Sequence, residues 1–353
     1  MRIIVDVMGG DNAPAELIKG AIKAAEDCSA EYVLVGNKAD IEKVAAENEL
    51  DLSAFSIVDA KETVEMIDDP ISSVRKKSES SMMVGLKLLA DGKGDAFVST
   101  GNTGALFTGA TLIVRRIKGI QRAGIATVLP MNSPVLLLDS GANINVTPEY
   151  IEAFAMMGSV YMKNIFGIEN PRVGLLNNGS ESGKGTQLHV DTYKRLRANL
   201  NINFVGNVEP NRVPFSACDV LVTDGFTGNI LIKSIEGMGK LMIDSIKGVF
   251  LSNGLTKVSA LLVKKQLSGM KKKFDTTEYG GAPLLGLRKP VIKAHGNSNA
   301  KAFSNAIKQA YSFACSGIID DITEEATLLR EKRLADEAKT LPHGALDGDE
   351  GIK

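Results

Sequence analysis

The sequence DAFVSTGNTGALFTGA, residues Asp95–Ala110, is the stretch that decides the predicted fold. It begins with the apolar run Ala96–Val98, breaks into the small and polar turn Ser99–Gly104, and continues as an apolar helix pattern. This order predicts a buried strand that delivers a turn to a sheet edge, followed by a helix whose first N–H groups lack backbone partners. Such a turn suits an anion such as phosphate, because the N–H groups and the helix dipole favour negative charge. The alternative is a tight strand-to-helix turn that needs glycine and binds nothing.

The composition is that of an ordinary globular protein. The chain has 353 residues, 44% hydrophobic and 24% charged, which is enough for one large α/β domain or two smaller ones. Its formal net charge of −1 gives no global positive field that would point to nucleic acid. The three cysteines are scattered and odd in number, which fits a reducing cytosol. The first residues lack a signal-peptide pattern and no apolar run reaches the roughly 18 residues of a membrane span, so we expect a cytoplasmic protein.

Strand and helix patterns alternate along most of the chain. Short apolar runs such as Arg2–Val7, Tyr32–Val35 and Val173–Leu176 are each followed by a turn and then by a helix pattern. This alternation predicts a three-layer α/β/α fold, in which a mostly parallel sheet is covered by helices on both faces. We expect residues 1–335 to form a single large domain and the polar residues 336–353 to form a flexible tail.

A turn rich in Gly, Asn, Thr or Asp recurs between an apolar run and a helix pattern. The turns are Met8–Asn12, Ser99–Gly104, Asp139–Asn143, Asn177–Gly185, Thr223–Asn229 and His295–Ser298. In open parallel sheets the ligand crevice lies at the carboxyl ends of the strands, where these turns would gather. The sequence therefore predicts one site built from several turns.

Two of the turns, Gly101–Gly104 and Gly225–Asn229, share a TGN element. Both offer backbone N–H groups, hydroxyls and carboxamides, which can bind phosphate or a carbonyl oxygen without a metal. The alternative is helix capping by Thr and Asn, and the second copy favours binding. The predicted substrate- and phosphate-binding residues are Gly101, Asn102, Thr103, Gly104, Asp224, Gly225, Thr227 and Gly228.

Few side chains offer acid, base or metal chemistry. Lys184 could supply a positive charge to an anion, although an exposed loop lysine is the simpler interpretation. His295 follows a strand and enters a Gly-Asn-Ser turn, a position that suits a general base, a phosphate ligand or a structural hydrogen bond. The carboxylates near strand ends lack a His cluster, so we expect turn and cap roles and no metal site. These carboxylates are Asp6, Asp11, Asp139 and Asp224.

Motifs that would indicate other chemistry are absent from the sequence. It contains no G-x-S-x-G nucleophile elbow, no GxGxxG dinucleotide fingerprint and no GxxxxGK[ST] phosphate loop. The chemistry predicted from the residues is therefore direct group transfer aided by oriented donors, without covalent catalysis.

A basic segment at about residues 247–273 forms the second unusual region. It carries seven lysines and no acid, and Leu251, Leu255, Val258 and Leu262 recur at helical spacing. A basic amphipathic helix of this kind can lie on an anionic membrane or bind an acidic protein, while packing on the core or on a second subunit is the alternative. The residues expected to contact a membrane or an acidic protein are Leu255, Lys257, Val258, Leu262, Lys264 and Lys265.

The chain resembles a known family from about Met1 to Ile319. The motifs that carry the resemblance are DVMGGDNAP, STGNTGAL, RIKGI, LLLDSGAN, GLLNNGSE, GKG, NINFVGNVE, VTDGFTGN, YGGAPLLGL and VIKAHGNS. Together they are similar to the bacterial phosphate acyltransferases of phospholipid synthesis. The resemblance implies a fold similar to isocitrate/isopropylmalate dehydrogenases and phosphotransacetylases, a homodimer and no organic cofactor.

The resemblance also implies a reaction, in which an acyl group passes from acyl-carrier protein to inorganic phosphate. The acyl phosphate would then pass to a membrane acyltransferase that loads glycerol 3-phosphate, so peripheral membrane association is expected. From the residues themselves, and not from the resemblance, we expect Lys184, Asn229 and His295 to be catalytic in this reaction. A thioester is already activated and phosphate is already anionic, so desolvation, orientation and oxyanion stabilisation suffice.

Three alternatives remain open at the level of sequence. A phosphotransacetylase-like enzyme would use coenzyme A thioesters in place of acyl-carrier protein. A dehydrogenase would bind a nicotinamide cofactor. A non-catalytic, membrane-associated scaffold of lipid synthesis would depend on the segment Phe250–Lys273 alone and would show no turnover.

Overall fold

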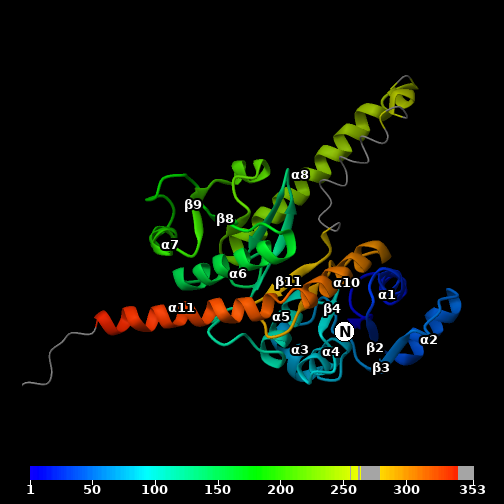
Figure 1. Ribbon diagram of the computed structural model, residues 1–353. Helices are drawn as coiled ribbons and strands as arrows, with labels where there is room; N and C mark the ends of the chain where they lie inside the picture. Colours follow the sequence, from blue (N-terminus) through cyan, green and yellow to red (C-terminus); the bar gives the residue numbers. More distant parts are fainter. Residues whose placement is uncertain (255, 261–262, 264–278, 341–353) are drawn as a thin grey trace, which may run out of the picture.

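The computed structural model describes residues 1–254, 256–260, 263 and 279–340. The strands form two mostly parallel sheets, each covered by helices (Figure 1). This confirms the expected α/β/α layering, although the sequence predicts one sheet and the structure has two.

The first sheet has seven strands in the order β3-β2-β1-β4-β12-β11-β5. The pairs among β3, β2, β1, β4 and β12 are parallel, whereas β11 runs antiparallel to both of its neighbours. The strands are β1 (Arg2–Asp6), β2 (Glu31–Gly36), β3 (Phe55–Asp59), β4 (Ala96–Ser99), β5 (Gly124–Ile125), β11 (Ala282–Leu285) and β12 (Val291–Lys293).

Alternate residues of the central strands face two different helix layers, as the period of two in a strand requires. Ile3 and Val5 belong to the apolar cluster that also holds residues of α1 (Ala15–Asp27) and α10 (Ala300–Cys315). Ile4 between them belongs to a second cluster. That cluster holds residues of α4 (Ser81–Ala90) and α5 (Thr103–Ile113). The sheet is therefore buried on both faces.

The second sheet has five strands in the order β6-β7-β10-β8-β9, and only the β6–β7 pair is antiparallel. The strands are β6 (Thr127–Pro130), β7 (Pro134–Leu138), β8 (Arg172–Leu176), β9 (Asn203–Val208) and β10 (Val220–Val222). One face packs with α6 (Pro148–Phe166), and the other packs with Ile232 of α8 (Gly225–Leu251). Further helices are α2 (Lys38–Glu47), α3 (Pro70–Lys76), α7 (Gln187–Ala198), the 3₁₀ helix η1 (Pro210–Phe215) and α11 (Ile318–Thr340).

The two sheets are connected at Ile125–Leu129, an apolar run whose pattern predicts one continuous strand. The structure divides this run at Ala126, whose N–H donates to the carbonyl of Pro283 in the first sheet. The preceding residues pair with β11 and the following residues pair with β7. The hydrogen-bond partners, which are distant in sequence, decide this division, so local pattern does not reveal it.

Helix boundaries differ from the sequence prediction in two further places. The pattern of Ser72–Ala90 predicts one helix, but the structure has two, α3 and α4. They are separated because Ser80 forms an isolated bridge with Glu62 and the N–H of Ser81 donates to the Glu62 carbonyl at 3.0 Å. At the other end, α11 continues to Thr340, beyond the expected start of the tail at position 336. The remaining tail positions, 341–353, lie outside the described residues.

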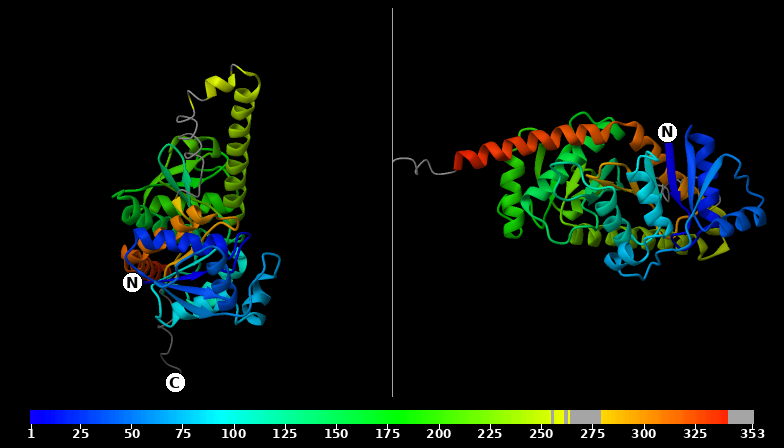
Figure 2. Two further views of the ribbon diagram at one scale, coloured as in Figure 1. Left: turned by 90° about the vertical axis from the view of Figure 1, so that its right-hand side faces the viewer. Right: turned by 90° about the horizontal axis from the view of Figure 1, so that it is seen from below.

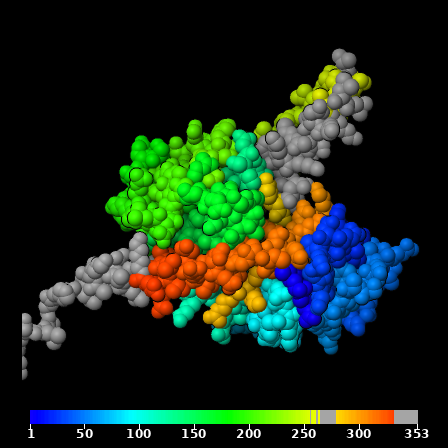
Figure 3. Space-filling model, in the orientation of Figure 1, coloured from blue at the N-terminus to red at the C-terminus, as the bar shows by residue number. Residues whose placement is uncertain are grey.

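Two long helices shape the surface. In Figures 1 and 2, α8 leaves the second sheet and projects beyond both sheets. In Figure 3, α11 lies along the part of the molecule that holds the second sheet, in agreement with its contacts to α6. Within the ranges described above, no helix combines the length and the apolar composition needed to cross a bilayer.

The predicted basic segment is only partly described. Lys247–Leu251 belong to the last turns of α8, and Lys257 and Val258 lie beyond it with exposed side chains. The other predicted contact residues lie outside the described residues, namely Leu255, Leu262, Lys264 and Lys265.

Candidate active site

Three of the predicted turns meet at the carboxyl edge of the first sheet. A Cβ atom at Gly9 would lie 2.7 Å from the Cα of Gly101, so the turns Met8–Asn12 and Ser99–Gly104 touch through their backbones. The N–H of Asp11 donates to the carbonyl of Gly296 at 2.9 Å, which adds the turn His295–Ser298. These glycines are therefore required by close packing of the backbone.

The amino-terminal end of α5 is the part of this group best suited to bind an anion. The Asn102 side chain caps the helix, because its Oδ1 accepts from the Ala105 N–H at 3.0 Å. Among the described residues, the N–H groups of Thr103 and Gly104 have no hydrogen-bond partner. Their dipoles and the helix dipole favour a negative group here. The carboxamide of Asn102, predicted to bind phosphate, serves the cap and a neighbouring loop in this structure.

A buried lysine lies directly beneath this turn. Lys293 is 8% exposed, and its Nζ donates to the carbonyl of Thr100 at 3.0 Å and to the carbonyl of Ala294. Nearby, the buried Asp6 carboxylate accepts from Ser99 Oγ at 2.7 Å. Burial raises the pKa of Asp6 and lowers the pKa of Lys293, while the charge of Asp6 partly offsets the change at Lys293.

Lys293 is not among the residues predicted from the sequence to belong to the site, and Asp6 was expected to have only a turn or cap role. The signal available in the sequence was a charged residue closing the apolar run Val291–Ile292 immediately before the turn that contains His295. Charged side chains are rarely buried without a partner, so a lysine at the end of a buried strand indicates a site where its charge is satisfied.

The lowered pKa of Lys293 makes stability depend on pH. Burial lowers this pKa from 10.5 to about 8. As pH rises through this window the unfolded chain holds a proton that the folded chain has released, so the Lys293 contribution makes the free energy of unfolding increase. Between pH 8 and pH 10.5 we expect the free energy of unfolding of the wild type to rise relative to that of Lys293→Met, which lacks this titrating group. Urea unfolding at several pH values measures this difference, and a constant difference would contradict the expectation.

The remaining three turns meet at the carboxyl edge of the second sheet. The buried Asp139 carboxylate accepts from the backbone N–H groups of Gly141, Ala142 and Asn143, which fixes the turn after β7. A Cβ atom at Gly228 would overlap the carbonyl oxygen of Asp139, so the first turn of α8 packs directly on this turn. Asp139 thus has the structural role expected from the sequence.

The start of α8 differs from the start of α5 because most of its donors are occupied. The N–H of Gly225 donates to the Asn143 carbonyl at 2.7 Å, and the Asp224 carboxylate accepts from the N–H and the hydroxyl of Thr227. A negative side chain therefore occupies the position that an anion would take. The structure gives Asp224 and Thr227 capping roles and makes α5 the better anion site.

Two exposed side chains lie at this edge of the second sheet, one on α8 and one in the loop after β8, which runs parallel to β10. Asn229 is exposed, and its Cγ lies 3.8 Å from the position of a Cβ at Gly141. Lys184 is also exposed, in the loop after β8, and its stem lies against Gly179. His189 of α7 lies near Asp224 as well. Burial lowers the pKa of His189, and the charge of Asp224 partly offsets this change.

The predicted catalytic residues are divided between the two groups of turns. His295 is exposed in the first group, where its Nδ1 accepts from the Asn297 N–H at 3.4 Å. Lys184 and Asn229 belong to the second group, and no hydrogen bond among the described residues joins either of them to His295. Ala142 of the second group packs on the second apolar cluster, which lies against the first sheet and also contains Leu106 of α5.

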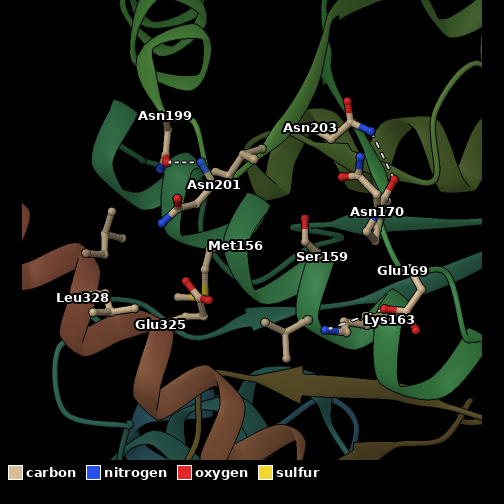
Figure 4. A pocket seen from close by; sticks show the side chains of 14 residues that line it. Met156, Ser159, Lys163, Glu169, Asn170, Asn199, Asn201, Asn203, Glu325 and Leu328 are labelled. Carbon is tan, nitrogen blue, oxygen red and sulfur yellow. Dashed lines mark hydrogen bonds and ion pairs between the residues drawn. The ribbon is translucent and has the colours of Figure 1, made fainter.

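A cavity of about 170 Å³ lies at the opposite edge of the second sheet (Figure 4). Glu169–Pro171 and Asn201–Asn203, which precede the amino ends of β8 and β9, form one wall, and Leu328 of α11 belongs to another. Ligand sites in open parallel sheets lie at the carboxyl ends, so this cavity is separate from the predicted site.

Comparison with known proteins identifies the family. The model of the family described as fatty acid synthesis protein matches residues 1–321. The chain belongs to this family. A phosphate acyltransferase from Thermoanaerobacterium thermosaccharolyticum is 44% identical over 330 residues, which are 93% of this chain and 98% of that protein. A second phosphate acyltransferase, from Thermoanaerobacter pseudethanolicus, is 46% identical over 327 residues, 92% of this chain and 97% of that protein.

Several solved structures of other proteins are similar in fold to this chain. A phosphotransacetylase from Streptococcus pyogenes has a TM-score of 0.62 and 16% identity, over 89% of this chain and 94% of that one. A 4-hydroxythreonine-4-phosphate dehydrogenase from Klebsiella pneumoniae has a TM-score of 0.51 and 14% identity, over 89% and 98% of the two chains. At these identities the likeness shows the fold alone, and it confirms the expected fold class.

Membership in the phosphate acyltransferase family confirms the resemblance on which the sequence analysis relied. The chain is an acyltransferase, and the family supports acyl transfer to phosphate. The identity of the acyl donor and the roles of single residues are taken up as proposals below.

Proposed function

We propose that the chain transfers a fatty acyl group from acyl-carrier protein to inorganic phosphate and so forms acyl phosphate for phospholipid synthesis. Phosphate binding is supported by the start of α5, where the N–H groups of Thr103 and Gly104 have no hydrogen-bond partner among the described residues. Beneath it the ammonium of Lys293 holds the Thr100 carbonyl and adds a buried positive charge. Phosphate is assigned to this turn.

The thioester carbonyl is assigned to the turn at the start of α8. Asn229 and Lys184 are exposed, and neither side chain makes a hydrogen bond within the described part of the chain. Their carboxamide and ammonium groups are therefore available to stabilise an oxyanion. The occupied donors of Gly225 and Thr227 make this end a poor phosphate site. His295 remains beside the phosphate turn as a candidate phosphate ligand.

The proposed reaction is a direct transfer. A phosphate oxygen attacks the thioester carbonyl carbon, a C–O bond forms, and the C–S bond breaks as the carrier protein leaves as its thiolate. The phosphate is anionic at neutral pH, so orientation and oxyanion stabilisation supply the catalysis. Two of the three cysteines are poor nucleophiles, since Cys28 and Cys218 are buried and burial raises the pKa of both thiols. The exposed Cys315 is the last residue of α10, whose first turn, not its end, follows the turn that contains His295.

The projecting part of α8 supports the proposal of a homodimer. Met238, Leu241, Met242 and Val249 are 57%, 58%, 44% and 65% exposed and recur at helical spacing. A continuous exposed apolar stripe of this kind is typical of an interface. Beyond it, Lys257 and the 61% exposed Val258 are proposed to contact an anionic membrane or the acidic carrier protein.

The donor is tested by offering the purified chain palmitoyl-carrier protein and palmitoyl-coenzyme A at equal concentrations with phosphate. Palmitoyl phosphate formed from the carrier-protein thioester alone supports the proposal. Equal rates from both thioesters would favour the phosphotransacetylase-like alternative, and no turnover with either would favour a non-catalytic scaffold.

A further inference from the structure

The loop Glu65–Ile71 exposes three large apolar side chains beside the phosphate turn. Met66 is 48% exposed, Ile67 is 95% exposed and Ile71 is 63% exposed. Single exposed apolar residues are common on protein surfaces, but three within six positions next to a candidate site indicate a contact surface.

This loop is held firmly against the site. The Nδ2 of Asn102 donates to the carbonyls of Met66 at 2.9 Å and of Asp68 at 3.1 Å. From the other side, Lys77 Nζ donates to the Asp68 carboxylate at 2.6 Å. The side chain that caps α5 therefore also fixes the loop. A preorganised loop loses little conformational entropy when it binds a ligand.

Met66 extends from the loop to a second turn of the same group. Its Cε lies 3.6 Å from the position of a Cβ at Gly296, in the turn that follows β12. Met66 is thus placed between the start of α5, where phosphate is proposed to bind, and the turn that contains His295. A methionine suits apolar ligands of variable shape, because its side chain is flexible and polarisable.

We propose that Met66, Ile67 and Ile71 bind the fatty acyl chain of the donor as it leaves the thioester. This inference rests on the proposed function and names the part of the substrate that the polar turns do not accommodate. The loop is continuous with the phosphate turn, so a chain attached to a carbonyl beside phosphate can reach it. Glu65 and Asp69 flank the apolar residues, but Arg75 and Lys76 are exposed on the same helix as Ile71 and the Lys76 charge acts on Asp69. The local charge is therefore balanced, and the position of the apolar residues beside the phosphate turn is what favours the acyl chain as their occupant.

The sequence contains no tryptophan, which permits a direct test. Ile67→Trp places a single fluorescent reporter on the loop, and Leu200→Trp places one at a position that is 93% exposed near the amino end of β9. On addition of palmitoyl-carrier protein we expect the emission of the first variant to shift to shorter wavelength, because the indole leaves water. Acetyl-carrier protein and free carrier protein should produce no shift, and the second variant should not respond to any of the three.

The same surface is tested by kinetics with the double variant Met66→Ser/Ile67→Ser. We expect kcat/KM for the palmitoyl donor to fall by about tenfold, since burial of apolar surface against the chain is lost. The value for the acetyl donor should be unchanged, and the control Leu200→Ser should leave both values unchanged.

Four outcomes would overturn the inference. An equal loss with both donors would show that the loop only supports the site. A tryptophan shift with free carrier protein would show a protein-docking surface. If the double variant lost binding to phosphatidylglycerol vesicles but kept the wild-type ratio of kcat/KM for the palmitoyl and acetyl donors, the surface would be a membrane contact. No tryptophan response to the palmitoyl donor would show that the chain lies elsewhere. The tryptophan experiment needs no turnover, so failure of the catalytic proposal is seen separately in the wild-type assay.

Discussion

Replacing Asn229 with Ala is expected to lower the rate of acyl phosphate formation about hundredfold, the effect of losing one oxyanion donor. Asn229 is exposed on the first turn of α8, over the turn that holds Gly141. Its carboxamide is free to donate to a charge that develops on the thioester oxygen. Because its side chain has no described hydrogen bond to lose, we expect the fold to be unchanged. The rate of acyl phosphate formation and the melting temperature together test this result.

The matched control for this prediction is Asn201→Ala. Asn201 is also exposed, but it lies at the amino end of β9, on the opposite edge of the second sheet. We expect wild-type activity from this control. Wild-type activity in a folded Asn229→Ala protein would contradict the assignment of Asn229 to the site.

Replacing Gly228 with Ala is expected to give the largest loss of stability from a single methyl group. A Cβ at this position would overlap the carbonyl oxygen of Asp139, a backbone atom in a turn that several hydrogen bonds fix. Helix α8 must therefore move away from the turn, at a cost of about 1–3 kcal/mol for an overpacked contact. Because the same movement displaces Asn229, we also expect activity to be lost. Urea unfolding and the acyl phosphate assay measure the two effects.

The control is the same substitution, glycine to alanine, at another position of α8. A Cβ at Gly237 would meet no atom within 4 Å, so Gly237→Ala relieves only the intrinsic helix penalty of glycine. We expect it to stabilise the fold by about 0.5–1 kcal/mol. If Gly228→Ala behaved like Gly237→Ala, the close contact between α8 and the Asp139 turn would be absent in solution.

Local signals explain which parts of the fold could be predicted from the sequence. The run Ala96–Val98 and the turn after it form β4 and the start of α5 as expected, because apolar run, capping residue and glycine follow one another within a few positions. Asn102 and Asp224 accept from the helix N–H groups that capping rules assign to them. The same local rules could not show that one helix start keeps free donors and the other does not.

Contacts between distant residues explain what was missed. Lys293 meets Thr100 across 193 positions of sequence, so neither neighbourhood contains a sign of the other. The division of the strands into two sheets depends in the same way on the pairing of Ala126 with Pro283. The candidate site shows this limit most clearly. The sequence predicts one site built from several turns, whereas the structure places His295 in one group of turns and Lys184 in the other.

The measurement that tests the central proposal most directly is the release of free carrier protein from palmitoyl-carrier protein by the purified chain, with and without phosphate. We expect release only when phosphate is present, with one palmitoyl phosphate formed for each carrier protein released. Release at the same rate without phosphate, or release that yields free palmitate, would contradict phosphate as the acyl acceptor.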